Sequence, residues 1–504
     1  MLTATVFTGA SLAAIACITA ASLIVAQRSW RVAVVVVVAA DALTWSWLDG
    51  LKETGNIVYW GTAAGIGVSL LLQAMSSTLA RRVLAAAVAT TAVLSATAIW
   101  SFEPHATLRE AATFGSALTI VGFAITRARG DEDGREGLAR ALGVIPLGAL
   151  AATLLVILLA HGQAVAEGGG VSGFMNGPNS LGILVSISVG FLFVVPKVDR
   201  NLSLLAACVA VLAFVLTLSA SRTGMLAAAA AFAVCEGGRR QWRKLTVGFA
   251  AALIAGTVAV VWVPNIATLG RPLVVPVKAS ASRKPPPAVA TPSRRPVVPA
   301  RDSQTSSTLQ PKGPPQVTQI FGGRVHDQSR FSALVGARDE AWQEAVHLLG
   351  RRPLLGSGFG TGDEIFQHDH VRGHFRYFVG AFDSQANVHD AYLQALLEIG
   401  ILGGLLFIMP AFLALASVGI SWFQRCLAPS DAAFAAATVA SAICSIFESM
   451  LAGFGAMTLL AWLSFAMVIT TMAVRRSAPE ASEAAEPNEP ERTFHPLATR
   501  ARAS

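Results

Sequence analysis

The stretch AYLQALLEIGILGGLLFIMPAFLALASVG, residues 391–419, carries a single charged side chain, that of Glu398. About 20 predominantly apolar residues are enough for a helix to cross the hydrocarbon core of a bilayer. The stretch therefore predicts a transmembrane helix. Its entrance is unusual, because the titratable residues His389 and Asp390 come immediately before it.

The same apolar pattern recurs along most of the 504 residues. The chain is 54% hydrophobic and only 13% charged, with a mean hydropathy of +0.57, whereas soluble domains carry roughly 25% charged residues. Apolar windows lie at 4–26, 31–50, 57–75, 83–100, 109–126, 142–161, 178–195, 202–219, 223–236, 245–263, 391–419, 431–450 and 456–474. These windows predict an all-α, polytopic transmembrane helix bundle of about 12–13 spans, in which the short 223–236 segment is either a full span or partly re-entrant.

Basic residues occupy alternate connections between these windows. They are Arg28, Arg31, Arg81, Arg82, Arg127, Arg129, Arg135, Arg140, Lys197, Arg200, Arg239, Arg240, Arg243, Lys244, Arg425, Arg475 and Arg476. Cytoplasmic loops of membrane proteins are enriched in Lys and Arg. This alternation places the N-terminus and the long 264–390 segment outside the cytoplasm, and it explains the net charge of +8 without nucleic-acid binding.

Composition divides the chain into four parts. Residues 1–263 hold the N-terminal transmembrane helices, 264–390 form the external loop, 391–474 hold the C-terminal helices, and 475–504 form a polar cytoplasmic tail. Within the loop, residues 271–316 are rich in Pro, Ser and basic residues and predict disorder, whereas 330–390 has helical apolar spacing and predicts a folded part.

Two polar sites at the outer ends of helices are candidates for chemistry. Arg222 lies in SASRTG (219–224), and an arginine at membrane depth is costly unless it is paired or functional. Its guanidinium suits phosphate oxygens, with Ser221 as a further donor, although a loop arginine resting in lipid headgroups fits equally well. Asn179, in the Gly-Pro turn NGPNS (176–180), is either part of the site or simply a helix N-cap.

The pair His389 and Asp390 also admits two interpretations. Asp390 is well placed to cap the helix that follows, and His389 is either a surface histidine or a base, since an imidazole titrates near neutral pH. Glu398, about two turns further on, is either a positioning residue or a buried structural acid. The histidines of HDHVRGH (368–374) match no strong metal-ligand spacing.

The glycine-rich turn and the cysteines indicate no cofactor. GSGFGTG (356–362) lacks the GK[ST] ending of a phosphate loop, so it does not predict nucleotide binding. Cys17, Cys208, Cys235, Cys426 and Cys444 are scattered and form no C-x-x-C pair, so neither a metal site nor a disulfide framework is indicated.

Taken in order, these motifs resemble a known family. Asn179 in a Gly/Pro turn is followed by S-R-T-G, a large external loop with R-x-x-x-W and P-L-L-G-x-G-x-G, and then H-[DN]-x-Y-L with E-x-G-x-x-G. This order is similar to that of the bacterial O-antigen ligase and O-antigen polymerase superfamily over roughly residues 170–460. The Pro-rich insertion at 271–316 and Asp390, where the family often has Asn, are departures from its pattern.

The resemblance implies an inverting membrane glycosyltransferase that uses a polyprenyl-diphosphate-linked glycan and requires no metal or other cofactor. Arg222 and Arg338 look like the family's diphosphate-binding arginines, and His389 looks like its catalytic histidine. Asp390, Glu398, Asn179 and Ser221 are expected to support them.

The resemblance also implies partners and a location. The acceptor is lipid A–core for a ligase, or another glycan for an O-antigen or exopolysaccharide polymerase, and the motifs are shared by both activities. The expected location is the bacterial inner membrane, in contact with membrane lipids, with the active face periplasmic. A transporter or flippase of a lipid-linked or anionic substrate is the alternative class, with Arg222 lining a path and His389 relaying protons.

Overall fold

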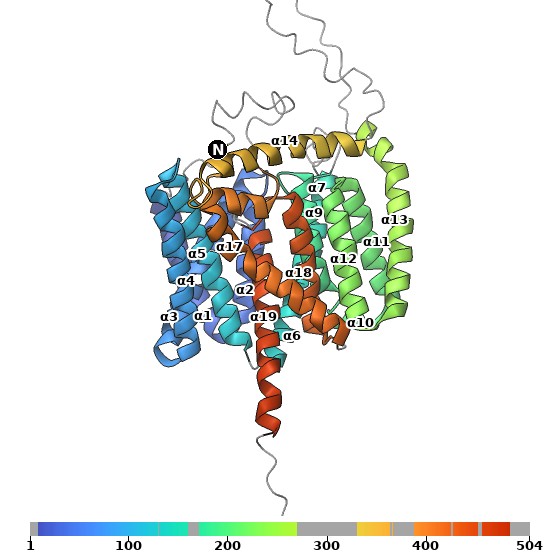
Figure 1. Cartoon of the computed structure of the whole chain (residues 1–504). Helices are drawn as coiled ribbons and strands as arrows, with labels where there is room; N and C mark the ends of the chain where they lie inside the picture. The colour runs from blue at the N-terminus through green and yellow to red at the C-terminus, as the bar shows by residue number, and fades with distance from the viewer. Residues whose placement is uncertain are drawn as a thin grey trace, which may run out of the picture. The chain divides into compact units, whose positions relative to one another are not determined.

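The computed structural model describes residues 9–129, 131–159, 171–269, 330–362, 365, 388–424, 427–451 and 456–483. The chain divides into two compact units, one of Met1–Gly270 with Ala337–Ser504 and one of Arg271–Gly336. The larger unit is a helical bundle (Figure 1). Ser46 and Met175 form an isolated antiparallel bridge.

Every predicted apolar window contains a helix, so the all-α prediction is confirmed. The N-terminal helices are α1 (Gly9–Arg28), α2 (Trp30–Thr44), α3 (Asp49–Ser76), α4 (Thr78–Ala96), η1 (Thr97–Ile99), α5 (Pro104–Ala128), α6 (Glu132–Leu142) and α7 (Val144–Leu159). The remaining helices are α9 (Pro178–Leu192), α10 (Pro196–Arg200), α11 (Leu202–Ser219), α12 (Arg222–Gly238), α13 (Trp242–Leu269), α14 (Arg330–Arg351), α17 (Ala391–Gln424), α18 (Pro429–Phe447) and α19 (Ala456–Glu483).

Ten of the described helical segments are long and apolar enough to cross a membrane, so this is a multi-pass membrane protein. The expected 12–13 spans exceed that number because α2, α9 and α12 have only 15, 15 and 17 residues. The helix at 223–236, which was short enough to be re-entrant, is the continuous α12.

Charged connections gather at one end of the bundle, which we call the basic end. Figure 1 shows α6 and α10 together at this lower end, with α17 beginning toward the opposite end. Arg240, after α12, donates to the carbonyl of Trp422 near the end of α17, and the Leu427 N–H donates to the carbonyl of Gly238. The chain starts α9, α12 and α17 at the other end, which we call the site end.

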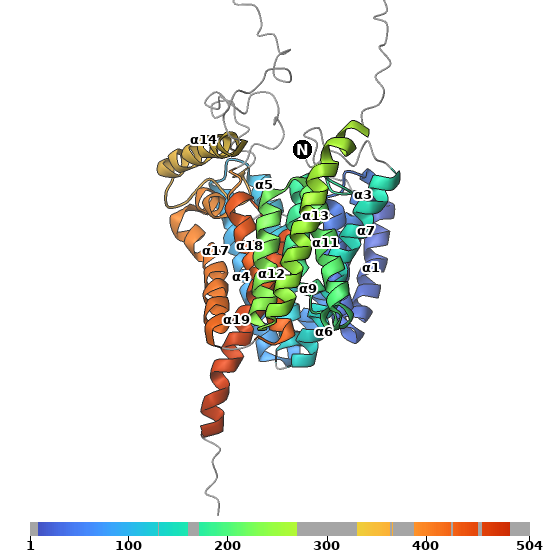
Figure 2. The ribbon, with the colours of Figure 1, turned by 90° about the vertical axis from the view of Figure 1, so that its right-hand side faces the viewer.

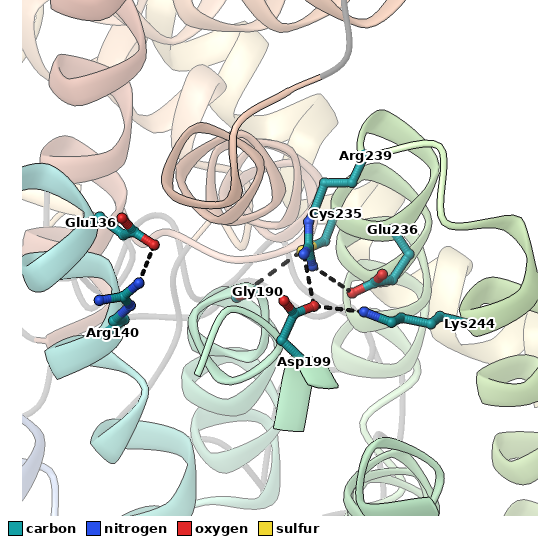
Figure 3. A network of polar contacts seen from close by, with 8 residues as sticks. All are labelled: Glu136, Arg140, Gly190, Asp199, Cys235, Glu236, Arg239 and Lys244. Atoms are coloured by element: carbon teal, nitrogen blue, oxygen red, sulfur yellow. Dashed lines mark hydrogen bonds and ion pairs between the residues drawn. The ribbon is translucent and has the colours of Figure 1, made fainter. Parts of the chain in front are cut away.

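The basic end is held by a compact ion network (Figure 3). Arg239 lies 2.7 Å from Asp199 of α10 and 3.4 Å from Glu236, while Lys244 lies 2.6 Å from Asp199. Glu236 is fully buried and the Arg239 side chain is 6% exposed. Each buried charge thus has an opposite charge beside it, which offsets the cost of its removal from water.

Glycines on α9 bring its neighbours close and fix the geometry of the site end. A Cβ at Gly182 would lie 2.4 Å from the Ser221 hydroxyl of α12, and one at Gly190 would lie 2.7 Å from Ala436 of α18. Small residues at such positions let helix backbones approach closely in lipid. Because α9 contacts both partners, the starts of α9 and α12 and the end of α18 have fixed relative positions.

The predicted helix at 391–419 is wrong in one respect, because α17 is broken at Gly400. This residue has φ 74° and ψ 173°, and a Cβ there would lie 2.1 Å from the Leu354 carbonyl oxygen. The break frees backbone carbonyls, and those of Leu397 and Glu398 accept from the Ser357 and Gly358 N–H groups. The E-x-G-x-x-G motif therefore marks a helix break that receives the glycine-rich turn, rather than a continuous helix.

Candidate functional site

His389 occupies a strained position at the site end, immediately before α17. Its φ of 49° lies in the left-handed region, which few residues other than glycine adopt. The Trp342 indole of α14 donates to the Val388 carbonyl at 3.0 Å, and Val388 is fully buried. Backbone strain of this kind persists only where the surroundings impose it, and it concentrates at functional sites.

Asp390 caps α17 as predicted. One carboxylate oxygen accepts from the N–H groups of Tyr392 and Leu393, both at 2.9 Å. Burial raises the pKa of the Asp390 carboxyl above its usual range, although these two hydrogen bonds oppose the rise. The capped helix start holds the backbone next to His389 in place.

The imidazole of His389 points to a carboxylate that the sequence analysis did not select. His389 Nδ1 lies 3.4 Å from Oε2 of Glu448, which directly follows α18. The amide of Asn179 donates to the other oxygen of Glu448, Oε1, at 3.1 Å. Glu448 therefore joins His389 to Asn179, and the three residues come from three separate parts of the chain.

The N-cap interpretation of Asn179 is wrong. Helix α9 begins at Pro178 after Gly177, which makes no side-chain cap hydrogen bond. Asn179 is thus already inside the first turn, and its amide faces Glu448. A signal for Glu448 was present in the sequence, because it lay within the predicted apolar window 431–450, where a carboxylate is costly unless partnered or functional.

Arg222 is the first residue of α12 and has an exposed side chain. It forms no hydrogen bond or ion pair with another residue in the described part of the chain. Ser221 is the N-cap of α12 and accepts from the Gly224 N–H at 3.2 Å. Asn179 lies one turn before Gly182, the α9 residue that packs against Ser221, so Arg222 leads α12 at the same end as Asn179.

Arg338 belongs to α14, one helical turn before Trp342. Residues four apart share one helix face. Its side chain lies outside the part of the structure that is described. Trp342 nevertheless connects the R-x-x-x-W motif to the backbone next to His389.

Glu398 is fully buried and organises the glycine-rich turn. Its carboxylate accepts from the N–H groups of Gly360 at 2.7 Å and Gly362 at 3.0 Å, and from the Gln394 amide at 2.6 Å. These two N–H groups of the turn therefore already donate to an acceptor within the protein. Of the two interpretations of Glu398, the geometry fits the structural acid, since its carboxylate binds the backbone of the glycine-rich turn.

The possible metal ligands at 368–374 lie outside the described residues. Within the described part, no group of three or more His, Cys, Asp or Glu side chains is arranged to hold a metal ion. The arrangement at the site end instead combines an imidazole, a carboxylate and a guanidinium that has no partner among the described residues. This set of groups suits proton transfer beside an anionic ligand.

The central region of the chain is similar to a known protein family. Residues 206–408 match the sequence model of a family described as O-antigen ligase. The match runs from α11 into α17 and includes Arg222, Arg338 and His389, whereas Asn179 and Glu448 lie outside it. It confirms the resemblance seen in the motifs. No curated protein and no solved structure matches the chain.

Proposed function

We propose that this chain, whose residues 206–408 match the O-antigen ligase family, transfers a glycan from a polyprenyl diphosphate to an acceptor sugar. The activity proposed is that of a ligase, with lipid A–core as acceptor and inversion at the anomeric carbon. The observation that carries the proposal is the contact between His389 and Glu448 at the site end, within the family's motif order.

His389 is the proposed base. In the tautomer in which Nδ1 carries the proton and donates to Glu448, the basic lone pair of the imidazole is on Nε2, and we assign to this atom the role of accepting the proton of an acceptor hydroxyl. The 3.4 Å separation is long for a hydrogen bond, and such contacts often tighten only when substrate is bound. Glu448 acts as a positioning residue that holds the ring, and Asn179 in turn holds Glu448.

Arg222 and Arg338 are the proposed diphosphate ligands. Arg222 is exposed at the N-terminus of α12, where unpaired backbone N–H groups and the helix dipole also favour an anion. Negative charge develops on the diphosphate as it leaves, and preorganised cations that meet this charge lower the barrier. No metal or cofactor enters the proposed mechanism.

The proposed transfer forms one bond and breaks one bond, so it needs no further reactant. The acceptor oxygen forms a bond to the anomeric carbon while the bond from that carbon to the diphosphate oxygen breaks. His389 takes the hydroxyl proton, and polyprenyl diphosphate leaves with the electron pair of the broken bond. Attack from the face opposite the leaving group inverts the anomeric carbon.

The donor's location fits a site at the end of membrane helices. A polyprenyl chain partitions into the bilayer, so its diphosphate lies at the lipid–water boundary. We place the reaction in the bacterial inner membrane, with the site end facing the periplasm, because basic connections gather at the opposite end.

The test is deletion of the gene in its host, complementation with variants, and analysis of surface and lipid-linked glycans. Loss of polymer from lipopolysaccharide, together with accumulation of lipid-linked polymer, is expected after deletion and in the His389→Ala strain. His347→Ala is the matched control, because His347 lies on α14 and its imidazole contacts Arg351 at 3.0 Å, so this strain should be fully rescued.

Other outcomes would change the proposal. A single repeat unit attached to the core would identify a polymerase and overturn the ligase activity. Full rescue by His389→Ala, at normal protein abundance in the membrane, would overturn the role of His389 as base.

A further inference from the structure

A cavity of about 650 Å³ lies on one side of the bundle, lined by α9, α11, α12 and α13. Figure 2 faces this side, where α11, α12 and α13 lie next to one another. The volume is typical of small-molecule sites, which span roughly 300–1,000 Å³. Small residues such as Ala229, Ala252 and Gly256 line it, so the space exists because side-chain volume is missing there. We call this cavity the lateral groove.

The walls of the lateral groove are apolar. Its polar lining residues are Thr217 and Thr257, whose hydroxyls donate to the carbonyls of Ala213 and Leu253 at 2.7 and 2.8 Å. Both hydroxyl protons are therefore already used within the residues' own helices. Such walls suit a hydrocarbon chain and offer little to a polar ligand.

The lateral groove opens toward the bilayer and runs along the helices. Leu253 and Val260 line it, yet they are 73% and 62% exposed. On α13 the lining extends from Phe249 to Val260, which is about 16 Å of helix at 1.5 Å per residue. This length is about half of the ~30 Å hydrocarbon core of a bilayer. A chain can therefore enter sideways from lipid without leaving the membrane.

The guanidinium of Arg222 lies on the helix face that lines the lateral groove. Residues at i, i+3 and i+7 share one helix face, so Arg222 lies on the same face of α12 as the lining residues Met225 and Ala229. Arg222 is exposed at the site end of this face. The order of features along α12 is thus a cation first and an apolar channel after it, which matches an anionic head group joined to a hydrocarbon tail.

We infer that the lateral groove holds the first isoprene units of the polyprenyl chain of the donor, with its diphosphate at Arg222. The inference rests on the proposed function and extends it, because it assigns the donor's entry side and the part of its tail that is recognised. Chain recognition stops where the lateral groove ends, near the bilayer midplane. Affinity therefore rises with the number of isoprene units only until the groove is filled.

The experiment measures binding of isopentenyl, farnesyl, geranylgeranyl and undecaprenyl diphosphate to the full chain in nanodiscs. Ala252→Phe fills the lateral groove, and Ala250→Phe places the same side chain on the exposed face of the same helix, outside the lining. We expect Ala252→Phe to weaken geranylgeranyl diphosphate binding about tenfold or more, a difference of about 1.4 kcal/mol. Isopentenyl diphosphate should bind both variants equally.

Two further measurements keep the result interpretable. Ala252→Met fills the groove less and covers the case in which Ala252→Phe fails to fold, as judged by its thermal unfolding. Phosphatidylglycerol is added as a competitor, since an annular lipid site would accept its acyl chains. It should not displace geranylgeranyl diphosphate.

The outcomes separate the two proposals. Equal effects of Ala252→Phe and Ala250→Phe, or displacement by phosphatidylglycerol, would overturn the lateral groove as a polyprenyl site. Arg222→Ala should weaken isopentenyl diphosphate binding whatever the groove does. If Arg222→Ala binds isopentenyl diphosphate normally while the groove variants behave as expected, the tail site stands and the assignment of the diphosphate to Arg222 fails.

Discussion

The two ends of the helical bundle differ in how their charged side chains are partnered. At the basic end, Arg239 lies between Asp199 and Glu236, and Lys244 completes the network (Figure 3). At the site end, Arg222 is exposed and has no partner among the described residues. In the first arrangement each charge has an opposite charge beside it, whereas the second has a charge available for a ligand. The comparison separates arginines that hold the protein together from one that is placed to bind.

The titration of Asp199 fits a structural role for the basic end. Burial alone would raise the pKa of this carboxyl, but hydrogen bonds from Lys244 and Arg239 outweigh burial and lower it. A carboxyl with a lowered pKa in the folded state stabilises the protein at pH values above about 3.9, its unfolded pKa. That contribution is lost only as the pH falls through the folded pKa, so the network is intact at neutral pH.

Exchanging the two arginines for methionine is the strongest test of this comparison. Arg239→Met leaves the buried carboxylate of Glu236 without its cation, and breaking such a pair costs about 3–5 kcal/mol. Arg222→Met should leave stability unchanged but lower glycan transfer roughly 100-fold or more, the usual effect of removing one electrostatic stabiliser of a transition state. Thermal unfolding in detergent and transfer to acceptor in nanodiscs measure the two effects.

The reverse pattern would break the comparison. If Arg222→Met unfolds the protein at lower temperature, its side chain is structural and the site end is not open to a ligand. If Arg239→Met keeps its stability, the network at the basic end contributes nothing.

The helix break in α17 allows a test of intermediate size. Gly400→Ala adds a Cβ where φ is +74° and the Leu354 carbonyl oxygen would be 2.1 Å away, so it should destabilise the site end by about 1–3 kcal/mol. Gly419→Ala is the matched control in the same helix, because nothing lies within 4 Å of the added carbon. Thermal unfolding should separate them, and equal behaviour would show that the break is not required.

Glu448→Gln should give the smallest of the three effects. The amide oxygen still accepts from Asn179, but the negative charge beside His389 is lost. We expect kcat to fall about tenfold, equivalent to 1.36 kcal/mol of transition-state stabilisation, with KM for the lipid-linked donor unchanged. A rise in KM at constant kcat would instead show that Glu448 serves donor binding.

Much of the architecture was predictable, because a transmembrane helix is specified by residues that are neighbours in the sequence. Each needs only a run of apolar residues, and every predicted window contains a helix. The boundaries and the number of spans were less predictable, since α2, α9 and α12 are shorter than a full bilayer crossing. The cap formed by Asp390 was also predictable, because a cap depends only on the next three residues.

Contacts between distant segments could not be predicted in the same way. Asn179 was interpreted as a possible cap because an asparagine at a helix start usually is one, yet its partner Glu448 lies 269 residues away. Glu398 is similar, because nothing in its own helix indicates that the N–H groups of Gly360 and Gly362 reach it.

The amino-acid sequence by itself determined the membrane class and the helices, because the length of each apolar stretch can be read from consecutive residues. It also identified His389, Arg222 and Arg338 as candidate site residues, because the order of the motifs is a property of the sequence. Only the tertiary structure decided that His389 faces Glu448, that α17 breaks at Gly400, and that a groove runs in line with Arg222. The physical reason is that these features arise where helices pack against one another. Close contacts of glycines, such as that of Gly182 with Ser221, determine how these helices pack.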